Sequence, residues 1–169
     1  MTGLCFVDAD VFISAADPRD AAKRQRSIAW LDLLWREQRG RTSAQVLAES
    51  YFALNRLARG AGAAEDAWQS VQKYFVWSPQ AIDDNVVRRA REIEQRFGIP
   101  WWDCMVVAAA QLQDCELLLT QGLQDNGVYG TVTVRSPFTL EVREAAATYA
   151  VSPRAARAHR PRGRPRRNV

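Results

Sequence analysis

Three carboxylates stand at positions where a purely structural role would favour apolar or neutral side chains. Asp8 follows directly on the apolar run Leu4–Val7. Glu49 shares a helical face with apolar neighbours, and Asp103 opens the most apolar segment of the chain. Carboxylates that are packed together in a partly dry cleft need either protons or a cation. Because oxygen ligands favour hard ions, these acids predict a site for Mg²⁺ or Mn²⁺.

Each of the three acids also has an ordinary structural interpretation. Asp103 could cap a helix or lie in its first turn, where an acid is favourable. Asp8 could begin a turn after the strand, since aspartate is a good turn residue. Glu49 would face solvent if its helix were rotated slightly. The combination of the three acids, rather than any one of them, favours a metal site.

The sequence has few of the histidine and cysteine residues that other kinds of catalytic centre need. The single histidine, His159, stands near the C-terminus, and the cysteines Cys5, Cys104 and Cys115 have no CxxC spacing. The sequence therefore gives little support to a zinc site or to histidine-based acid/base chemistry. The cysteines stand in apolar surroundings, so we expect small core residues of a cytoplasmic protein in a reducing compartment.

The alternation of short apolar strands with long helical segments predicts a parallel sheet that is covered by helices on both faces. Apolar residues at helical spacing, caps and turn signals set the expected bounds. The expected elements are a strand at Leu4–Val7, a helix including Ile28–Trp35, a helix capped by Ser43 and ended by Gly60 and Gly62, a helix over Glu65–Tyr74, a strand at Phe75–Trp77, a helix over Ile82–Phe97 closed by Gly98, a helix opened by Trp101, strands at Glu116–Thr120 and Thr131–Arg135, and a turn at Asn126-Gly127.

The positive charge of the chain belongs to its C-terminal segment. Of the 23 lysines and arginines, seven arginines fall between Arg154 and Val169, so the remaining 16 are outnumbered by the 19 acids. The composition of residues 146–169, rich in Arg and Pro, predicts a tail that is disordered when free. The tail could be a solvated appendage or could hold nucleic acid electrostatically. The candidate contacts are Arg160, Arg162, Arg164, Arg166 and Arg167.

The 169 residues suit one globular domain, which we place at residues 1–145. No stretch approaches ~18 uninterrupted apolar residues, so we expect no membrane span. The start of the chain has acids by position 8 and is typical of a first strand rather than of a signal peptide.

Four blocks of the sequence together resemble the PIN-domain family and, within it, the VapC-type toxin ribonucleases. They are FVDADVFISA at 6–15, TSAQVLAESYFAL at 42–54, IPWWDCMVVAAAQ at 99–111 and LLLTQGLQDNGVYGTVTVRSPF at 117–138. The resemblance implies a three-layer α/β/α fold with a central parallel sheet of four to five strands. It also implies an acidic pocket that binds Mg²⁺ or Mn²⁺, cleavage of single-stranded RNA, dimerisation, and inhibition by a cognate antitoxin.

The resemblance assigns roles residue by residue. The first three acids of the family fall on Asp8, Glu49 and Asp103. Asp10 stands where relatives more often have asparagine, and Gly122 stands in place of the fourth acid. Asp125, three residues after Gly122, is an additional candidate ligand. A second metal ion needs ligands of its own, so Gly122 leaves it in doubt.

These features predict a Mg²⁺- or Mn²⁺-dependent endoribonuclease that acts as the toxin of a type II toxin–antitoxin pair. One alternative is a phosphatase of the haloacid-dehalogenase type, because Val7–Asp10 resembles its nucleophile strand. That chemistry also needs a lysine, and neither Lys23 nor Lys73 stands in a suitable later motif. The other alternative is a nucleic-acid- or antitoxin-binding protein with little turnover. Trp101 and Trp102 are expected to be core or pocket wall rather than base-stacking platforms.

Overall fold

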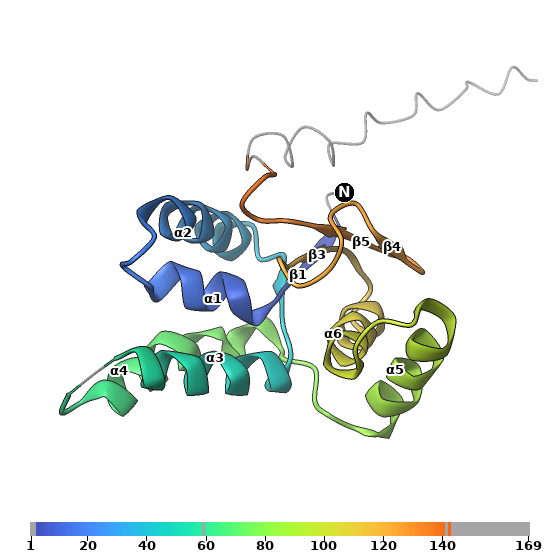
Figure 1. Ribbon diagram of the computed structural model, residues 1–169, viewed down its shortest axis with the longest axis horizontal. Helices are drawn as coiled ribbons and strands as arrows, with labels where there is room; N and C mark the ends of the chain where they lie inside the picture. The colour runs from blue at the N-terminus through green and yellow to red at the C-terminus, as the bar shows by residue number, and fades with distance from the viewer. Residues whose placement is uncertain (1–2, 59, 141, 143–169) are drawn as a thin grey trace, which may run out of the picture.

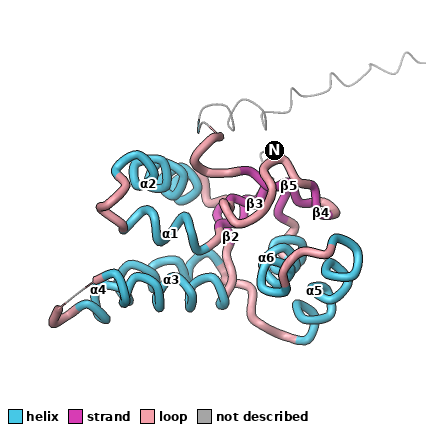
Figure 2. The backbone as a smooth tube through the Cα atoms, in the orientation of Figure 1, coloured by secondary structure: helices cyan, strands magenta, loops and turns pink. Residues whose placement is uncertain are grey.

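The computed structural model describes residues 3–58, 60–140 and 142, which form a five-stranded sheet with helices around it (Figures 1 and 2). In chain order the elements are β1 (Leu4–Val7), α1 (Ala9–Ala16), α2 (Ala21–Arg36), β2 (Gly40–Arg41), α3 (Ala44–Leu57), α4 (Ala63–Gln72), the 3₁₀ helix η1 (Lys73–Trp77), α5 (Asp84–Phe97), α6 (Trp101–Leu112), β3 (Cys115–Leu119), β4 (Val128–Tyr129) and β5 (Val132–Arg135). The predicted tail, 146–169, with its candidate arginines, lies outside the described residues.

The sheet has the strand order β2-β1-β3-β5-β4. The pairs β1–β2, β1–β3 and β3–β5 are parallel, whereas the short edge strand β4 runs antiparallel to β5. The predicted parallel sheet of four to five strands is therefore confirmed, with one antiparallel strand at its edge. Because β1, β2, β3 and β5 run in the same direction, their carboxyl ends meet at one edge of the sheet.

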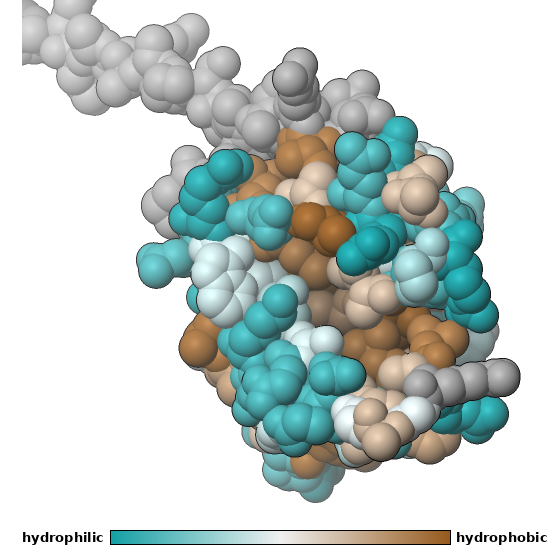
Figure 3. All heavy atoms as spheres, turned by 90° about the vertical axis from the view of Figure 1, so that its left-hand side faces the viewer, coloured by the Kyte–Doolittle hydropathy of each residue, from teal (hydrophilic) through white to brown (hydrophobic). Residues whose placement is uncertain are grey.

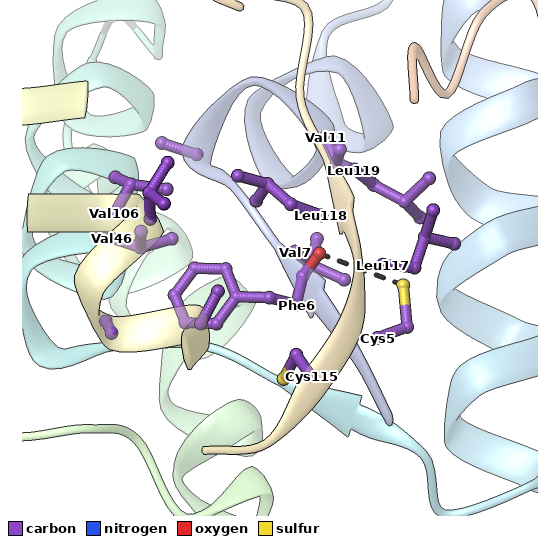
Figure 4. Packing of buried hydrophobic residues seen from close by; sticks show 14 of the residues in the cluster. Cys5, Phe6, Val7, Val11, Val46, Val106, Cys115, Leu117, Leu118 and Leu119 are labelled. Carbon is purple, nitrogen blue, oxygen red and sulfur yellow. Dashed lines mark hydrogen bonds between the residues drawn. The ribbon is translucent and has the colours of Figure 1, made fainter. Parts of the chain in front are cut away.

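Apolar side chains from both faces of the sheet form the core. Figure 4 shows Phe6 and Leu118 directed toward Val46 of α3 and Val106 of α6, whereas Leu117 points to the opposite side. Helix α2 lies on one side of the strands, and α5 and α6 lie on the other (Figure 1). This arrangement is the expected three-layer α/β/α fold. The three cysteines are buried and unpaired, as predicted.

Local signals in the sequence account for the ends of the helices next to the site. The Ser43 hydroxyl accepts a hydrogen bond from Val46 N at 3.2 Å, so Ser43 caps α3 as predicted. Gly98 ends α5 with a φ of 64°, a conformation that favours glycine. Helix α6 is buried from Cys104 to Ala110, which agrees with its nearly uniform apolar sequence.

The predicted strand at Phe75–Trp77 is wrong, because this segment belongs to the 3₁₀ helix η1. The expected helix over Glu65–Tyr74 correspondingly ends at Gln72. Residues three apart lie on the same side of a 3₁₀ helix. Tyr74 and Trp77 are accordingly both buried, with ring centroids 4.9 Å apart, whereas Phe75 between them is exposed. A strand would have put Tyr74 and Trp77 on opposite faces.

A groove with apolar side chains in its floor lies between the α1–α2 pair and the α3–α4 pair, which pack against each other through α1 and α3. It consists of two adjoining hollows of about 320 and 450 Å³, which share Ala16, Leu54 and Ser70. In Figure 3 hydrophobic side chains fill the hollow between hydrophilic rims. No helix in the described part of the chain has the length and apolar character to cross a bilayer.

Candidate active site

The first part of the site lies where β1 and β3 end side by side. Val7 is paired with Leu119, and Asp8 N donates a hydrogen bond to Leu119 O at 3.1 Å. The next residue after β3, Thr120, is 1% exposed. Its hydroxyl donates to Asp8 Oδ2 at 2.7 Å, while Asp8 Oδ1 accepts from Ala9 N at 2.7 Å. Asp8 is thus held by a neighbouring strand end and by its role as the N-cap of α1.

The other two predicted acids come from α3 and α6. Glu49 lies on the exposed side of α3, and its Oε1 accepts a hydrogen bond from the buried Gln45 amide at 2.9 Å. Asp103 lies in the first turn of α6. The N-cap of that helix is Pro100, which has no side-chain hydrogen-bond group, so Asp103 does not cap the helix. Asp103 therefore lies at the N-terminal end of a helix that is otherwise largely buried.

The charges of neighbouring acids act on both Asp8 and Asp103. Burial raises the pKa of Asp8 above its usual range, hydrogen bonds from Thr120 and Ala9 lower it, and the charges of Glu49 and Asp103 raise it. Burial raises the pKa of Asp103 as well, followed by the charge of Glu49. No basic side chain is among the causes for either group in the described part of the protein. The structure therefore places Asp8, Glu49 and Asp103 near enough for their charges to interact.

Asp10 is a fourth acid beside this group. Burial, followed by the charge of Asp8, raises its pKa to about 7, although a hydrogen bond from Gln121 N and the charge of Lys23 lower it. Gln121 N donates to Asp10 Oδ2. Asp10 Oδ1 is buried and has no hydrogen-bond partner among the described residues. An asparagine at this position would keep the shape without the charge.

Gly122 occupies a place that faces the acids. Its N–H donates to the Thr120 hydroxyl at 3.0 Å. A Cβ atom on Gly122 would lie 3.5 Å from Thr120 Oγ1 and 3.8 Å from Asp103 Oδ1. A side chain here would therefore point between Asp103 and the Asp8–Thr120 pair. The position where the resemblance expects a fourth acid lies at the site, but glycine offers no ligand.

Asp125 is engaged away from the other acids. Its Oδ1 accepts hydrogen bonds from Ser136 N at 2.8 Å and from Arg135 Nε at 3.2 Å. The Ser136 hydrogen bond, followed by the charge of Arg135, holds the pKa of Asp125 below its usual range despite some burial. The structure thus ties Asp125 to the end of β5 and does not bring it to Asp8 and Asp103.

The donor atoms suit a hard divalent ion, although they do not form a closed ligand set. In the described residues, no three His, Cys, Asp or Glu side chains are gathered closely enough to hold a metal by themselves. The acids nevertheless supply carboxylate oxygens. Each of the two Asp8 oxygens accepts one hydrogen bond and keeps one lone pair free for a metal ion. Mg²⁺ commonly binds through one or two carboxylates and keeps several waters. The residues therefore fit an ion whose shell is completed by water or substrate.

Sequence reasoning assigned no role to Thr120, which orients Asp8. The signal was present, because Thr120 is a polar residue directly after the buried strand β3. The same feature after β1 had singled out Asp8. What the sequence could not give is the pairing of β1 with β3, which places the two residues side by side.

The family of the chain follows from its sequence match. The PIN domain matches residues 5–124, a span that contains Asp8, Glu49 and Asp103. The chain belongs to the PIN-domain family. PIN-domain nucleases generally use divalent metal ions, and the oxygen donors of this PIN domain suit such ions.

A solved structure supports the same fold. The PIN domain is similar to the crystal structure of VapC20 from Mycobacterium tuberculosis, described as a toxin that cleaves the sarcin-ricin loop. The TM-score is 0.52 at 20% sequence identity, and the match covers 68% of this chain and 86% of VapC20. At this identity the likeness concerns the fold alone. Comparison with curated proteins gave no match.

The charge of Asp10 predicts how the stability of the metal-free protein depends on pH. Its pKa is about 7 in the folded state against 3.8 ordinarily, so the folded state binds the extra proton between these values. Stability should therefore fall as pH rises through this window, by on the order of 2 kcal/mol between pH 5 and pH 8. Asp10→Asn should be more stable than the wild type at pH 8 and about equally stable at pH 5.

Chemical unfolding of both proteins in EDTA at the two pH values measures this difference. An identical fall in stability for the wild type and Asp10→Asn would show that Asp10 does not carry the predicted charge effect.

Proposed function

We propose that this PIN domain is a Mg²⁺- or Mn²⁺-dependent endoribonuclease whose site is built from Asp8, Glu49 and Asp103. The observation that carries the proposal is that neighbouring acids raise the pKa of Asp8 and of Asp103, with no basic side chain of the described residues among the charges that act on either. Such a group is stabilised by a dication, which also allows a polyanion to approach. Membership in a family of nucleases supports the same activity.

The side chains have separate tasks in this proposal. Asp8 and Asp103 would hold the ion directly or through water, with Glu49 nearby. A bound ion would supply a Lewis acid for a phosphate oxygen and a water of lowered pKa. Thr120 fixes the orientation of the Asp8 carboxylate by its hydrogen bond of 2.7 Å. Gln45 holds Glu49 in the same way from one helical turn earlier.

The biological role that we propose is that of a toxin in a type II toxin–antitoxin pair, acting in the cytoplasm as a homodimer. Its partners would be an RNA substrate and a cognate antitoxin protein. The likeness in fold to VapC20 supports this role. The smaller hollow of the groove, which Leu54 and Leu57 line, is mostly apolar, and an exposed apolar surface of this kind supports a protein ligand.

A binding protein with little turnover is the second candidate function. Two observations favour it: Gly122 leaves the fourth acid position without a ligand, and the described acids do not form a closed metal set. Incubation with RNA and Mn²⁺ separates the two functions, because a binding protein leaves the RNA intact. The haloacid-dehalogenase alternative gains no support from a chain of the PIN-domain family.

Removing one carboxylate charge at the site should abolish RNA cleavage. We expect no cleavage of tRNA or another structured RNA by Asp8→Asn or Asp103→Asn, or by the wild type in EDTA. Loss of a group that acts directly on the reaction lowers rates by orders of magnitude. Gel analysis of the RNA with Mn²⁺ measures the effect, while thermal unfolding checks that the variants remain folded.

Two further substitutions serve as comparisons. Asp114→Asn changes an acid just beyond the opposite end of α6, at a residue whose φ of 54° asparagine tolerates, and should retain cleavage. Asp125→Asn should also retain cleavage if the carboxylate only ties Ser136 and Arg135 to its loop. Continued cleavage by Asp8→Asn or Asp103→Asn would refute the assignment of the site.

The C-terminal arginines are proposed to add non-specific affinity for nucleic acid. Seven arginines without an acid between Arg154 and Val169 would bind phosphates and release counterions. A chain that ends at Pro153 should therefore show a flatter plot of log K against log salt, by about 0.7 for each lost phosphate contact on single strands. Fluorescence anisotropy with a single-stranded RNA measures both slopes. Equal slopes would remove the tail from RNA binding.

A further inference from the structure

Trp102 does not lie in the core, which is one of the two places expected for it. The half-buried Trp101 does pack against the core, whereas Trp102 is 63% exposed. The helix that carries it is otherwise buried from Cys104 to Ala110. The exposed ring thus stands on the open first turn of α6, directly before Asp103.

A second exposed aromatic residue stands beside another of the acids. Phe52 of α3 is 62% exposed and follows Glu49 by three residues, which places both on neighbouring positions of one helix face. The guanidinium of Arg56, one turn further on, lies 5.6 Å from the centre of the Phe52 ring. Each of the two exposed rings therefore adjoins an acid of the candidate site on its own helix, Phe52 next to Glu49 on α3 and Trp102 next to Asp103 on α6.

We propose that Trp102 and Phe52 are stacking platforms for the bases of unpaired nucleotides in the RNA substrate. This inference rests on the proposed function and names the residues that hold the RNA. The acids repel phosphates, so the substrate needs binding energy that does not depend on its charge. Every base has a flat aromatic face, and stacking on an aromatic side chain supplies such energy without sequence preference. Arg56 adds a cation next to Phe52 for a neighbouring phosphate.

The test separates contacts with bases from contacts with phosphates. Binding is measured by fluorescence anisotropy for a short single-stranded RNA and for the same strand made abasic throughout, which keeps the phosphates. All proteins carry the full chain and the Asp103→Asn substitution, so that the RNA is not cut and the tail contributes equally. We expect Trp102→Ala and Phe52→Ala each to weaken binding of the normal strand by roughly tenfold. Binding of the abasic strand should not change.

Two variants sharpen the comparison. Trp102→Phe keeps an aromatic face and should retain most of the affinity that Trp102→Ala loses. Phe75→Ala removes a ring that is 52% exposed on η1, which carries none of the site's acids, and should bind both strands like the parent protein.

Equal weakening for the normal and abasic strands, or no weakening in either alanine variant, would overturn the stacking role. The outcome is independent of the nuclease proposal. If the wild type failed to cut RNA while these base-dependent losses were observed, the proposal of a stacking surface would stand and the proposal of nuclease activity would be refuted.

Discussion

Repulsion between carboxylates is the constraint on which the candidate site depends. The charges of Glu49 and Asp103 raise the pKa of Asp8, the charge of Glu49 raises that of Asp103, and the charges acting on these two groups in the described residues include no basic side chain. The fold does not allow the acids to relax apart freely. The Asp8 carboxylate accepts hydrogen bonds from the hydroxyl of Thr120 and from the backbone of α1. Asp103 lies in the first turn of the buried helix α6. A divalent cation is the simplest stabilising partner for such an arrangement.

The sheet explains why residues so distant in the sequence meet. Parallel strands bring their carboxyl ends to one edge, where Asp8 and Thr120 follow β1 and β3 directly. Helices α3 and α6 begin near that edge, so the second turn of α3 carries Glu49 and the first turn of α6 carries Asp103 toward the same place. The backbone therefore fixes the cluster, and side-chain hydrogen bonds only adjust it. Gly122 is the exception, because its backbone reaches the site without a ligand.

Much of this could be predicted from the sequence, because strong local signals agree with the fold. Ser43 and Gly98 mark helix ends by their own chemistry, and the apolar run of β1 ends at the acid that it positions. The three acids were found because each is out of place in its local pattern. Asp10 and Asp125 show the limit of that method. The partner of Asp10 is Gln121, which is distant in the sequence. The partners of Asp125 are Arg135 and Ser136, which follow it across a turn.

The features that the sequence did not reveal depend on tertiary packing. Helix α1 was missed because Asp-Ala-Asp also suits a turn, whereas Asp8 in fact caps a helix. The aromatic run at Phe75–Trp77 suits a strand by composition, but packing of Tyr74 on Phe12, with ring centroids 4.6 Å apart, selects a 3₁₀ helix. Trp102 is an apolar residue yet is exposed, because its exposure depends on how α6 is oriented in the fold and not on its residue type.

Anomalous diffraction from crystals soaked in Mn²⁺ tests the central claim most directly. Mutual repulsion of the acids predicts a manganese peak between the carboxylates of Asp8 and Asp103, with Glu49 within reach directly or through water. The peak should vanish in crystals of Asp8→Asn. Fully soaked crystals with no peak at the carboxyl ends of β1 and β3 would contradict a metal site built from these acids.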